Sequence, residues 1–274
     1  MTKRLKDGVR RLIARNRRSS TVGMLHKFSN FVNQAYRNNG LDPEIDGEYH
    51  IIKRLREAHP RIAFDVGANC GEWLMEALSA WTDCHFHAFE VAPETSERLA
   101  DRIHRSKYGS RVTLNGFGLS NFDGKMEVYY DSDHPNLTTV LRLKKALQIQ
   151  NYVAVPFDAS LRTGDRYVAN HRIAAVDFLK IDVEGAEYQV LEGLKDCLSQ
   201  TKIHCLQFEY CPFAIQTKFL LIDFYSLLSE KYWIGKVYPN SVEFRDYEWP
   251  MEVFEFANYC AVSKARADLR EMLS

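Results

Sequence analysis

Several kinds of sequence feature are missing from this chain, and each absence excludes a class of protein. No run of about 18 apolar residues occurs, so the sequence predicts no transmembrane helix. The basic start is not followed by an uninterrupted apolar run, so no secretory signal is expected. The six cysteines form no C-x-x-C pair. This argues against a disulfide framework or a zinc site and favours the reduced, mostly buried thiols of a cytoplasmic protein.

The chain also has no excess of charge of one sign. Its 36 basic residues balance 36 acidic ones, so the chain as a whole is not predicted to bind nucleic acid. Internal repeats and low-complexity linkers are absent, so no second domain of independent function is expected. With 274 residues, 46% of them hydrophobic, a sizeable core is possible. We expect one domain over residues 59–274, preceded by a basic segment and helical extension over residues 1–58.

The basic residues are concentrated at the N-terminus. A single acid, Asp7, stands among eight cations in residues 1–18: Lys3, Arg4, Lys6, Arg10, Arg11, Arg15, Arg17 and Arg18. Further along, apolar residues that include Leu25, Phe28, Phe31 and Val32 recur at helical spacing. They predict an amphipathic helix that ends near Asn38-Asn39-Gly40.

Alternative roles are open for this extension. Its apolar face would cover the core or a homodimer partner, or it would dock with the basic run on an anionic membrane surface. The second role would place the protein peripherally at the inner membrane face. The basic run would otherwise be a solvated tail or a contact for an acidic acceptor.

Strands and helices alternate over the remainder of the chain. After a short helix at 49–58, apolar patterns predict strands at 62–66, 85–90, 111–115, 176–181 and 203–210. Helices are predicted between them at 71–80, 94–106, 187–199 and 217–230. A strand at 125–130 indicates an inserted β element, and the tail predicts strands at 233–238, 241–246 and 254–262. This order predicts an α/β fold, a mostly parallel sheet with helices on both faces.

The first of these strands runs into a glycine-bearing turn and then a helix, which is typical of a nucleotide pocket. A dinucleotide fold needs G-x-G-x-x-G, whereas here only Gly67 and Gly71 flank the turn that contains Asn69. Asp65 lies at the strand end, where it would repel a pyrophosphate. An acid there suits a ligand that carries an ammonium and a sulfonium, such as S-adenosylmethionine. The alternative is a tight turn without a ligand.

Glu90 ends the second strand, about 20 residues beyond the glycine turn. In a doubly wound sheet an acid at this place accepts hydrogen bonds from ribose hydroxyls. The alternative for Glu90 is an exposed loop acid.

A second group of acids follows strand 176–181. Asp182 and Glu184 leave the strand beside Gly185, and two clustered acids repel each other unless a cation or a proton is shared. Both therefore point to function, whereas Glu187, at the start of a helix, has at least as good a structural explanation. Glu209, at the end of the next strand, and His134, in the loop Asp131–Asn136, are further candidates for a general base.

The ordered motifs of the chain resemble those of the FkbM family of class I S-adenosylmethionine-dependent methyltransferases. The matching motifs are Asp65-Val66-Gly67-Ala68-Asn69-x-Gly71, Glu90 with Pro93, Asn115 through Ser120, and Lys180-Ile181-Asp182-Val183-Glu184-Gly185-x-Glu187. Strand Asn258–Val262 is similar to the last strand of the family. The chain departs from the family at Gly118, where an Ala is usual before Leu-Ser, and at Thr163-Gly164-Asp165, where Thr-Leu-Asp is usual.

The resemblance implies a Rossmann-like sheet with an antiparallel C-terminal strand, S-adenosylmethionine as cofactor, and O-methylation of a sugar or natural-product hydroxyl. We expect Asp65 near the ammonium, Gly67 and Gly71 along the methionine, and Glu90 on the ribose. The turn that contains Gly118, Leu119 and Ser120 would flank adenine, and Asn115 would fix it. Asn115 and Ser120 have an equally good explanation as caps of backbone groups.

Asp182 and Glu184 are expected at the methyl-facing end of the cofactor, where one of them would position or deprotonate the acceptor hydroxyl. No His/Asp spacing demands a metal, although the acids would be able to hold a divalent cation. Two other kinds of function stay open: a cofactor-binding protein without catalysis, and an NAD-type nucleotide-dependent sugar-modifying enzyme.

Overall fold

The computed structural model describes residues 3–40, 42–131, 138–139 and 155–274. The chain divides into two compact units, Met1–Gly40 and Leu41–Ser274. The division comes earlier in the chain than the boundary expected between residues 58 and 59. The reason is that helix α3 (Glu48–Leu55) buries Ile51, Ile52 and Leu55 in a core of the second unit.

The first unit consists of two helices, α1 (Lys3–Arg15) and α2 (Ser20–Arg37). The Ser19 side chain accepts a hydrogen bond from the Val22 N–H and so caps the start of α2. Asn38 ends α2 in the left-handed conformation, with φ 53°. The predicted helix and its stop are therefore confirmed, whereas α1 was expected only as a basic segment. Within the described residues, neither these helices nor any later one is long and apolar enough to cross a membrane.

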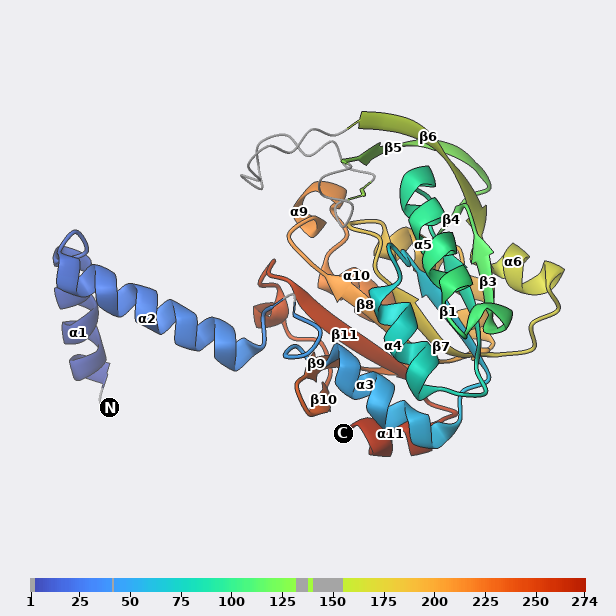
Figure 1. Cartoon of the computed structure of the whole chain (residues 1–274). Helices are drawn as coiled ribbons and strands as arrows, with labels where there is room; N and C mark the ends of the chain where they lie inside the picture. The colour runs from blue at the N-terminus through green and yellow to red at the C-terminus, as the bar shows by residue number, and fades with distance from the viewer. Residues whose placement is uncertain (1–2, 41, 132–137, 140–154) are drawn as a thin grey trace. The chain divides into compact units, whose positions relative to one another are not determined.

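The second unit is built on an eight-stranded sheet in the order β10-β9-β11-β8-β7-β1-β2-β3 (Figure 1). Strands β3, β2, β1, β7 and β8 pair in parallel, and β11 runs antiparallel between β8 and β9. Their bounds are β1 Ile62–Val66, β2 His85–Phe89, β3 Val112–Asn115, β7 Val176–Ile181, β8 Ile203–Tyr210, β9 Tyr232–Tyr238, β10 Ser241–Phe244 and β11 Ala257–Ser263. The predicted mostly parallel sheet with an antiparallel C-terminal strand is confirmed.

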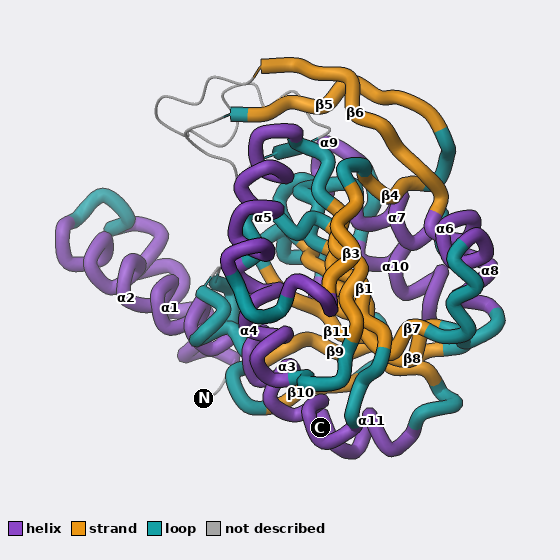
Figure 2. Tube along the Cα trace, turned by 45° about the vertical axis from the view of Figure 1, so that its right-hand side comes forward, coloured by secondary structure: helices purple, strands orange, loops and turns teal. Residues whose placement is uncertain are grey.

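Helices cover both faces of this sheet, because successive strand residues point to opposite faces. Ala63 and Phe178 belong to one core, which also contains apolar residues of α3, α4 (Glu72–Ala80), α5 (Pro93–Arg105) and α11 (Ala267–Leu273). Their strand neighbours Phe64 and Leu179 belong to the other core, with residues of α6 (Gly164–Asn170), α7 (Glu187–Glu192), α8 (Lys195–Ser199), α9 (Ala214–Thr217) and α10 (Leu221–Leu228). Figure 2 shows the helices on either side of the strands. Short 3₁₀ turns lie at η1 (Arg56–Ala58), η2 (Gly109–Arg111) and η4 (Trp249–Met251).

A separate three-stranded sheet stands beside the main one (Figures 1 and 2). It consists of β4 (Gly118–Ser120), β6 (Val155–Thr163) and β5 (Gly124–Tyr130). Strand β5 is the predicted inserted element, whereas β4 and β6 were not predicted. This sheet explains why the predicted helix 187–199 is interrupted. A Cβ at Gly193 would lie 1.9 Å from the carbonyl oxygen of Ser120, so only glycine fits between α7 and α8.

The six cysteines are free thiols, and all but Cys70 are buried. The prediction that most of the cysteines are buried is confirmed.

Candidate active site

Backbone hydrogen bonds join the carboxyl ends of four parallel strands into one edge. The N–H groups of Gly67 and Ala68 both donate to the carbonyl of Phe89 at 3.0 Å, which ties the turn after β1 to the end of β2. On the other side, the Asp182 N–H donates to the Val66 carbonyl at 2.9 Å. The Glu90 N–H donates to the Asn115 carbonyl at 3.1 Å and adds the end of β3. The predicted motif residues are therefore brought to one place, which is where open α/β sheets bind ligands.

The two glycines of the first turn are required by close contacts. Both have positive φ, 84° at Gly67 and 81° at Gly71. A Cβ at Gly67 would lie 1.8 Å from the carbonyl oxygen of Asp182, and one at Gly71 would lie 2.5 Å from Cδ1 of Leu99. Gly67 thus lets the turn after β1 lie directly against the acidic end of β7.

Asp65 is fully buried near the end of β1, and within the described part of the chain neither of its carboxylate oxygens has a hydrogen-bond partner. Burial raises the pKa of Asp65 to about 6, although Lys180 opposes the shift. A buried carboxylate without a partner costs stability, and a bound ammonium or donor would remove that cost. The position fits the cationic end of S-adenosylmethionine.

Glu90 is 5% exposed and shapes the same turn. Its Oε2 accepts from the N–H of Asn69 and its Oε1 accepts from the N–H of Ala92, each at 2.8 Å. Asn69 has φ 46°, and its Oδ1 accepts from the N–H of Cys70. Burial raises the pKa of Glu90 to about 7, against the effect of these backbone bonds. Glu90 is therefore not an exposed loop acid, and each oxygen keeps a lone pair for a hydroxyl donor.

Sequence reasoning missed Lys180 and Glu48. Lys180 is 5% exposed, and its Nζ lies 2.8 Å from Oδ2 of Asp182 and 3.7 Å from Oε1 of Glu48. Burial alone would lower the pKa of Lys180, but Asp182, Glu48 and Asp65 outweigh it and raise that pKa. Glu48, from α3, also accepts from Nε2 of Gln207. A lysine within the apolar strand Val176–Ile181 was the available signal, because buried lysines need partners.

Asp182, Glu184 and Glu209 converge beyond β7 and β8. One carboxylate oxygen of each lies within 4.8 Å of the other two. Oε2 of Glu184 and Oε2 of Glu209 are buried and have no hydrogen-bond partner among the described residues. Burial raises the pKa of Glu209 well above its ordinary value, and Asp182 and Glu184 raise it further. Burial and the charge of Asp182 do the same for Glu184. A carboxylate with a raised pKa suits proton transfer near neutral pH.

Glu187 differs from these three acids because its oxygens are used. They accept from the N–H groups of Val183 and Gly185 at 3.0–3.1 Å. This fixes the turn in which Glu184 has φ 52° and Gly185 has φ 107°. The structural explanation of Glu187 is confirmed.

The segment expected to flank adenine forms β4 rather than a free turn. Leu119 is 3% exposed and packs in the core with α7. The amide of Asn115 donates to the carbonyls of Ala88 and Thr113, so Asn115 caps backbone groups. Ser120 Oγ donates to Oδ1 of Asn121. A Cβ at Gly118 would lie 3.7 Å from Val91, the residue after Glu90. The segment thus lies next to Glu90, and its contact with adenine stays a prediction. His134 lies outside the described residues.

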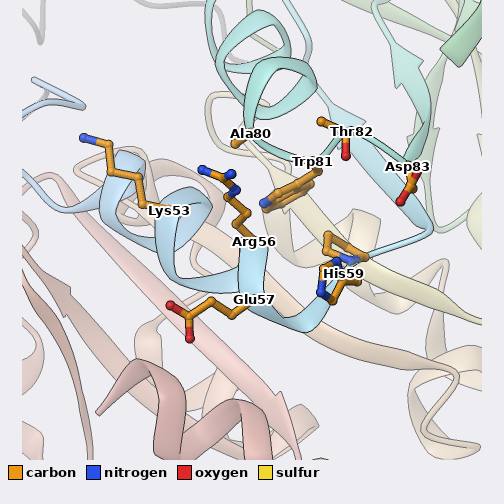
Figure 3. A pocket seen from close by; sticks show the side chains of 9 residues that line it. Lys53, Arg56, Glu57, His59, Ala80, Trp81, Thr82 and Asp83 are labelled. Carbon is orange, nitrogen blue, oxygen red and sulfur yellow. The ribbon is translucent and has the colours of Figure 1, made fainter.

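Two cavities in the described part of the chain lie away from this edge. One, of about 540 Å³, is lined by Lys53, Arg56 and His59 on one side and by Ala80–Asp83 on the other (Figure 3). It lies at the amino ends of β1 and β2, because Pro60 and Asp83 precede those strands. The other, of about 420 Å³, is lined by residues of α6 and α8. Neither includes a residue of the acidic edge.

The strand order and the site together define a class. A parallel sheet with one antiparallel strand between β8 and β9, a glycine turn after β1 and an acid at the tip of β2 are the features of a class I methyltransferase. Comparison with known proteins gives the family. The model of the methyltransferase FkbM domain matches residues 65–232, and the chain belongs to this family.

Two curated relatives and one solved structure illustrate the similarity. The hexuronic acid methyltransferase AglP of Haloferax volcanii is 27% identical over 157 residues, which cover 57% of this chain and 59% of the relative. The 31-O-demethyl-FK506 methyltransferase FkbM of Streptomyces tacrolimicus is 30% identical over 155 residues, which cover 49% of this chain and 60% of the relative. The chain therefore spans less than two thirds of either relative. A methyltransferase FkbM from Methylobacillus flagellatus is similar at 15% identity, with a TM-score of 0.46 over 87% of this chain and 60% of that one.

Membership in this family makes S-adenosylmethionine the cofactor. The residues present fit it, because Asp65 offers two buried oxygens that have no hydrogen-bond partner among the described residues, and each oxygen of Glu90 can still accept a bond from a hydroxyl. Asp65 and Glu90 would hold its ammonium and ribose hydroxyls.

Proposed function

We propose that this chain transfers a methyl group from S-adenosylmethionine to a hydroxyl oxygen of a sugar, in a glycan or a glycosylated natural product. The observation that carries the proposal is the group of three carboxylates, Asp182, Glu184 and Glu209, beside the turn at Gly67. The names of the two curated relatives refer to a hexuronic acid and to 31-O-demethyl-FK506, and both are consistent with an oxygen acceptor.

The cofactor supplies an activated methyl group, so the protein has to align the acceptor oxygen and accept its proton. Glu209 and Glu184 suit the proton acceptor, because each has a raised pKa and a buried oxygen without a partner among the described residues. Asp182 suits a positioning role, because its Oδ2 is held by Lys180 at 2.8 Å. Lys180 in turn is held by Glu48.

The test has two arms. Isothermal titration of the full chain should give binding of S-adenosylhomocysteine and none of NAD. Incubation with labelled S-adenosylmethionine and a panel of hexuronic-acid glycans, neutral glycans and hydroxylated macrolides should transfer label to an oxygen of one acceptor class. Cofactor binding without transfer to any member of a broad panel would favour a binding protein without catalysis. Label on nitrogen or carbon would contradict O-methylation.

We further propose that the unit Met1–Gly40 contacts an anionic membrane surface. In α1, Leu5, Val9, Leu12 and Ile13 recur on one face and are 40–65% exposed, and Lys and Arg occupy most other positions. In α2, Phe28 and Phe31 are 66% and 67% exposed. Basic amphipathic helices of this kind lie in the membrane interface, and each cation near an anionic surface contributes about 1 kcal/mol.

Sedimentation with phosphatidylglycerol-containing vesicles tests this contact. The full chain should sediment at low salt, and the double variants Arg10→Glu/Arg11→Glu and Phe28→Ser/Phe31→Ser should stay in the supernatant. Trp249→Ser, which removes an exposed aromatic residue of the other unit, is the control. Equal recovery of all proteins in the supernatant would reject the proposal, and a dimer that dissociates in the Phe variant would assign the apolar face to a second copy.

A further inference from the structure

We propose that Asp182, Glu184 and Glu209 bind a divalent cation of the Mg²⁺ or Mn²⁺ type, and that this cation receives hydroxyl oxygens of the acceptor. The inference rests on the proposed function for the second part only, because the cation site is defined by the protein alone. It would make the reaction depend on a metal, which the spacing of residues in the sequence does not demand.

The geometry of the three carboxylates fits one ion. Their nearest oxygens all lie within 4.8 Å of one another. Oxygen ligands lie about 2.0–2.6 Å from Mg²⁺, Mn²⁺ or Ca²⁺, so two ligands on opposite sides of an ion are about 4–5 Å apart. The three oxygens come from two neighbouring strand ends, Asp182 and Glu184 after β7 and Glu209 in β8, and parallel pairing fixes those strands in register.

A second observation points to a missing ligand. Glu209 is 9% exposed, and its Oε2 has no hydrogen-bond partner within the described ranges. Oε2 of Glu184 is also buried without a partner there. Glu187, three residues after Glu184, is 4% exposed, but its oxygens accept backbone N–H groups. Glu187, which fixes the turn, therefore has hydrogen-bond partners for its carboxylate. Where Asp182, Glu184 and Glu209 converge, two buried carboxylate oxygens have no partner among the described residues.

The nearby lysine does not neutralise the group. Nζ of Lys180 is shared between Asp182 and Glu48. Within the part of the chain that the structure describes, neither Glu184 nor Glu209 forms an ion pair. When all three carboxylates are ionised, they carry more negative charge than the one shared lysine balances, and a divalent ion would compensate for it.

The ligand type favours a hard ion. Carboxylate oxygens select Mg²⁺, Ca²⁺ and Mn²⁺ over zinc and copper, which prefer nitrogen and sulfur. Three protein oxygens leave further coordination positions, and neighbouring hydroxyls of a sugar are ligands of the same type. Each of the three carboxylates contributes one oxygen to the site.

Titration of the full chain with Mn²⁺ tests the site without an activity measurement. Electron paramagnetic resonance measures the free Mn²⁺ that remains at each point. The protein should bind one Mn²⁺, and Mg²⁺ should compete. Glu184→Gln and Glu209→Gln should each weaken Mn²⁺ binding at least about tenfold, as loss of one ligand usually does. Glu243→Gln, at an exposed position of β10, should bind as the unaltered chain does. Titration of S-adenosylhomocysteine should confirm that each variant keeps its fold.

Absence of Mn²⁺ binding, or binding that neither Gln variant weakens, would overturn the cation site. Failure of the proposed function has a different signature: Mn²⁺ binding that depends on Glu184 and Glu209, with no methyl transfer to any acceptor. Undiminished transfer in the presence of a chelator would overturn the role of the cation while leaving O-methylation in place.

Discussion

One acid at the amino edge of the main sheet, where the parallel strands begin, is hydrogen-bonded differently from three acids at the carboxyl edge, where those strands end. At the amino edge, Asp177 of β7 accepts from the N–H groups of Arg61 and Ile62 and lies 2.9 Å from Nδ1 of His204. Burial would raise the pKa of Asp177, but these hydrogen bonds outweigh it and lower that pKa. At the carboxyl edge, Asp65, Glu184 and Glu209 have buried oxygens without partners in the described residues, and their pKa values are raised.

The difference separates Asp177, whose oxygens are used within the fold, from the candidate functional acids Asp65, Glu184 and Glu209. Asp177 and Glu184 lie on β7 or directly after it, so residue type and strand do not distinguish them. Hydrogen bonding and burial do, because the Asp177 side chain is 24% exposed and bonded, whereas Oε2 of Glu184 is buried without a partner among the described residues. A carboxylate that holds backbone N–H groups stabilises the fold, whereas unsatisfied ones cost stability and persist where a ligand or a reaction uses them. The comparison predicts that changes at the carboxyl edge affect binding and turnover, and that changes at the amino edge affect stability alone.

The largest effect is expected from Gly67→Ala. The new Cβ would lie 1.8 Å from the Asp182 carbonyl oxygen, and φ is 84°, so the ends of β1 and β7 would have to separate. Strain at a positive φ alone costs about 1–3 kcal/mol. We expect a lower melting temperature and loss of S-adenosylhomocysteine binding by titration. Gly109→Ala, where a Cβ meets only the Ile103 carbonyl at 3.6 Å, is the control. Normal binding of S-adenosylhomocysteine by Gly67→Ala would contradict the prediction that changes at the carboxyl edge impair binding.

The next effect is on turnover. Glu184→Gln and Glu209→Gln keep the volume of the side chain and remove its basicity, so transfer should fall by about 10²–10⁴-fold while S-adenosylhomocysteine affinity is retained. Glu243→Gln, on the exposed edge strand, should have normal turnover. Near-normal turnover in both site variants would move the proton acceptor elsewhere, with Asp182 and His134 as the remaining candidates.

The sequence predicted much of the arrangement at the carboxyl edge of the sheet. Strands β1, β7 and β8 begin and end where the apolar patterns predicted, because each strand is rich in apolar residues and a glycine, a proline or an acid follows within two residues of its end. Asp65, Gly67, Glu90 and Asp182 were placed together because parallel strands end at one edge. Such predictions require only the positions of the strand ends and the types of residue that occur there.

The remainder depended on contacts between distant segments. The pairing of β4 with β6 joins residues that are far apart in sequence, and no local pattern specifies it. Glu48 reaches the site because α3 places it 3.7 Å from Nζ of Lys180. The spacing of apolar residues in the sequence does not reveal that contact. The capping role of Asn115 and the bonds of Glu187 were open choices in the sequence, and the hydrogen bonds decide both.

The pH dependence of stability tests the difference between the acids of the two edges. Burial raises the pKa of Glu48 and of Glu90 from 4.5 to about 7, so between these values the folded state binds more protons than the unfolded state. The free energy of unfolding without ligand should therefore decrease as the pH rises from about 4.5 to about 7. Asp177 acts in the opposite sense, because its lowered pKa gives stability that is lost only as the pH falls below 3.8.

Urea unfolding across this pH range measures the effect, and Glu48→Gln and Glu90→Gln should each flatten the dependence. S-adenosylhomocysteine should bind more tightly as the pH rises through about 7, because ionised Glu90 accepts from the ribose hydroxyls. Stability that rises with pH over the whole interval would contradict the raised pKa values.

The smallest effect on function is expected from Asp177→Asn. The substitution removes the charge that pairs with His204 and weakens the bonds from the N–H groups of Arg61 and Ile62. Hydrogen bonds to a charged group are each worth about 1.5–3 kcal/mol, and the partly exposed amide would replace some of them, so we expect about 1–3 kcal/mol less stability. Affinity for S-adenosylhomocysteine should not change, because the bonds of Asp177 lie at the amino end of β1, opposite the turn at Gly67. Urea unfolding and titration of the same preparation separate the two quantities. A loss of cofactor affinity as large as the loss of stability would mean that the two edges are energetically coupled, and the division between structural and functional acids would then fail for this sheet.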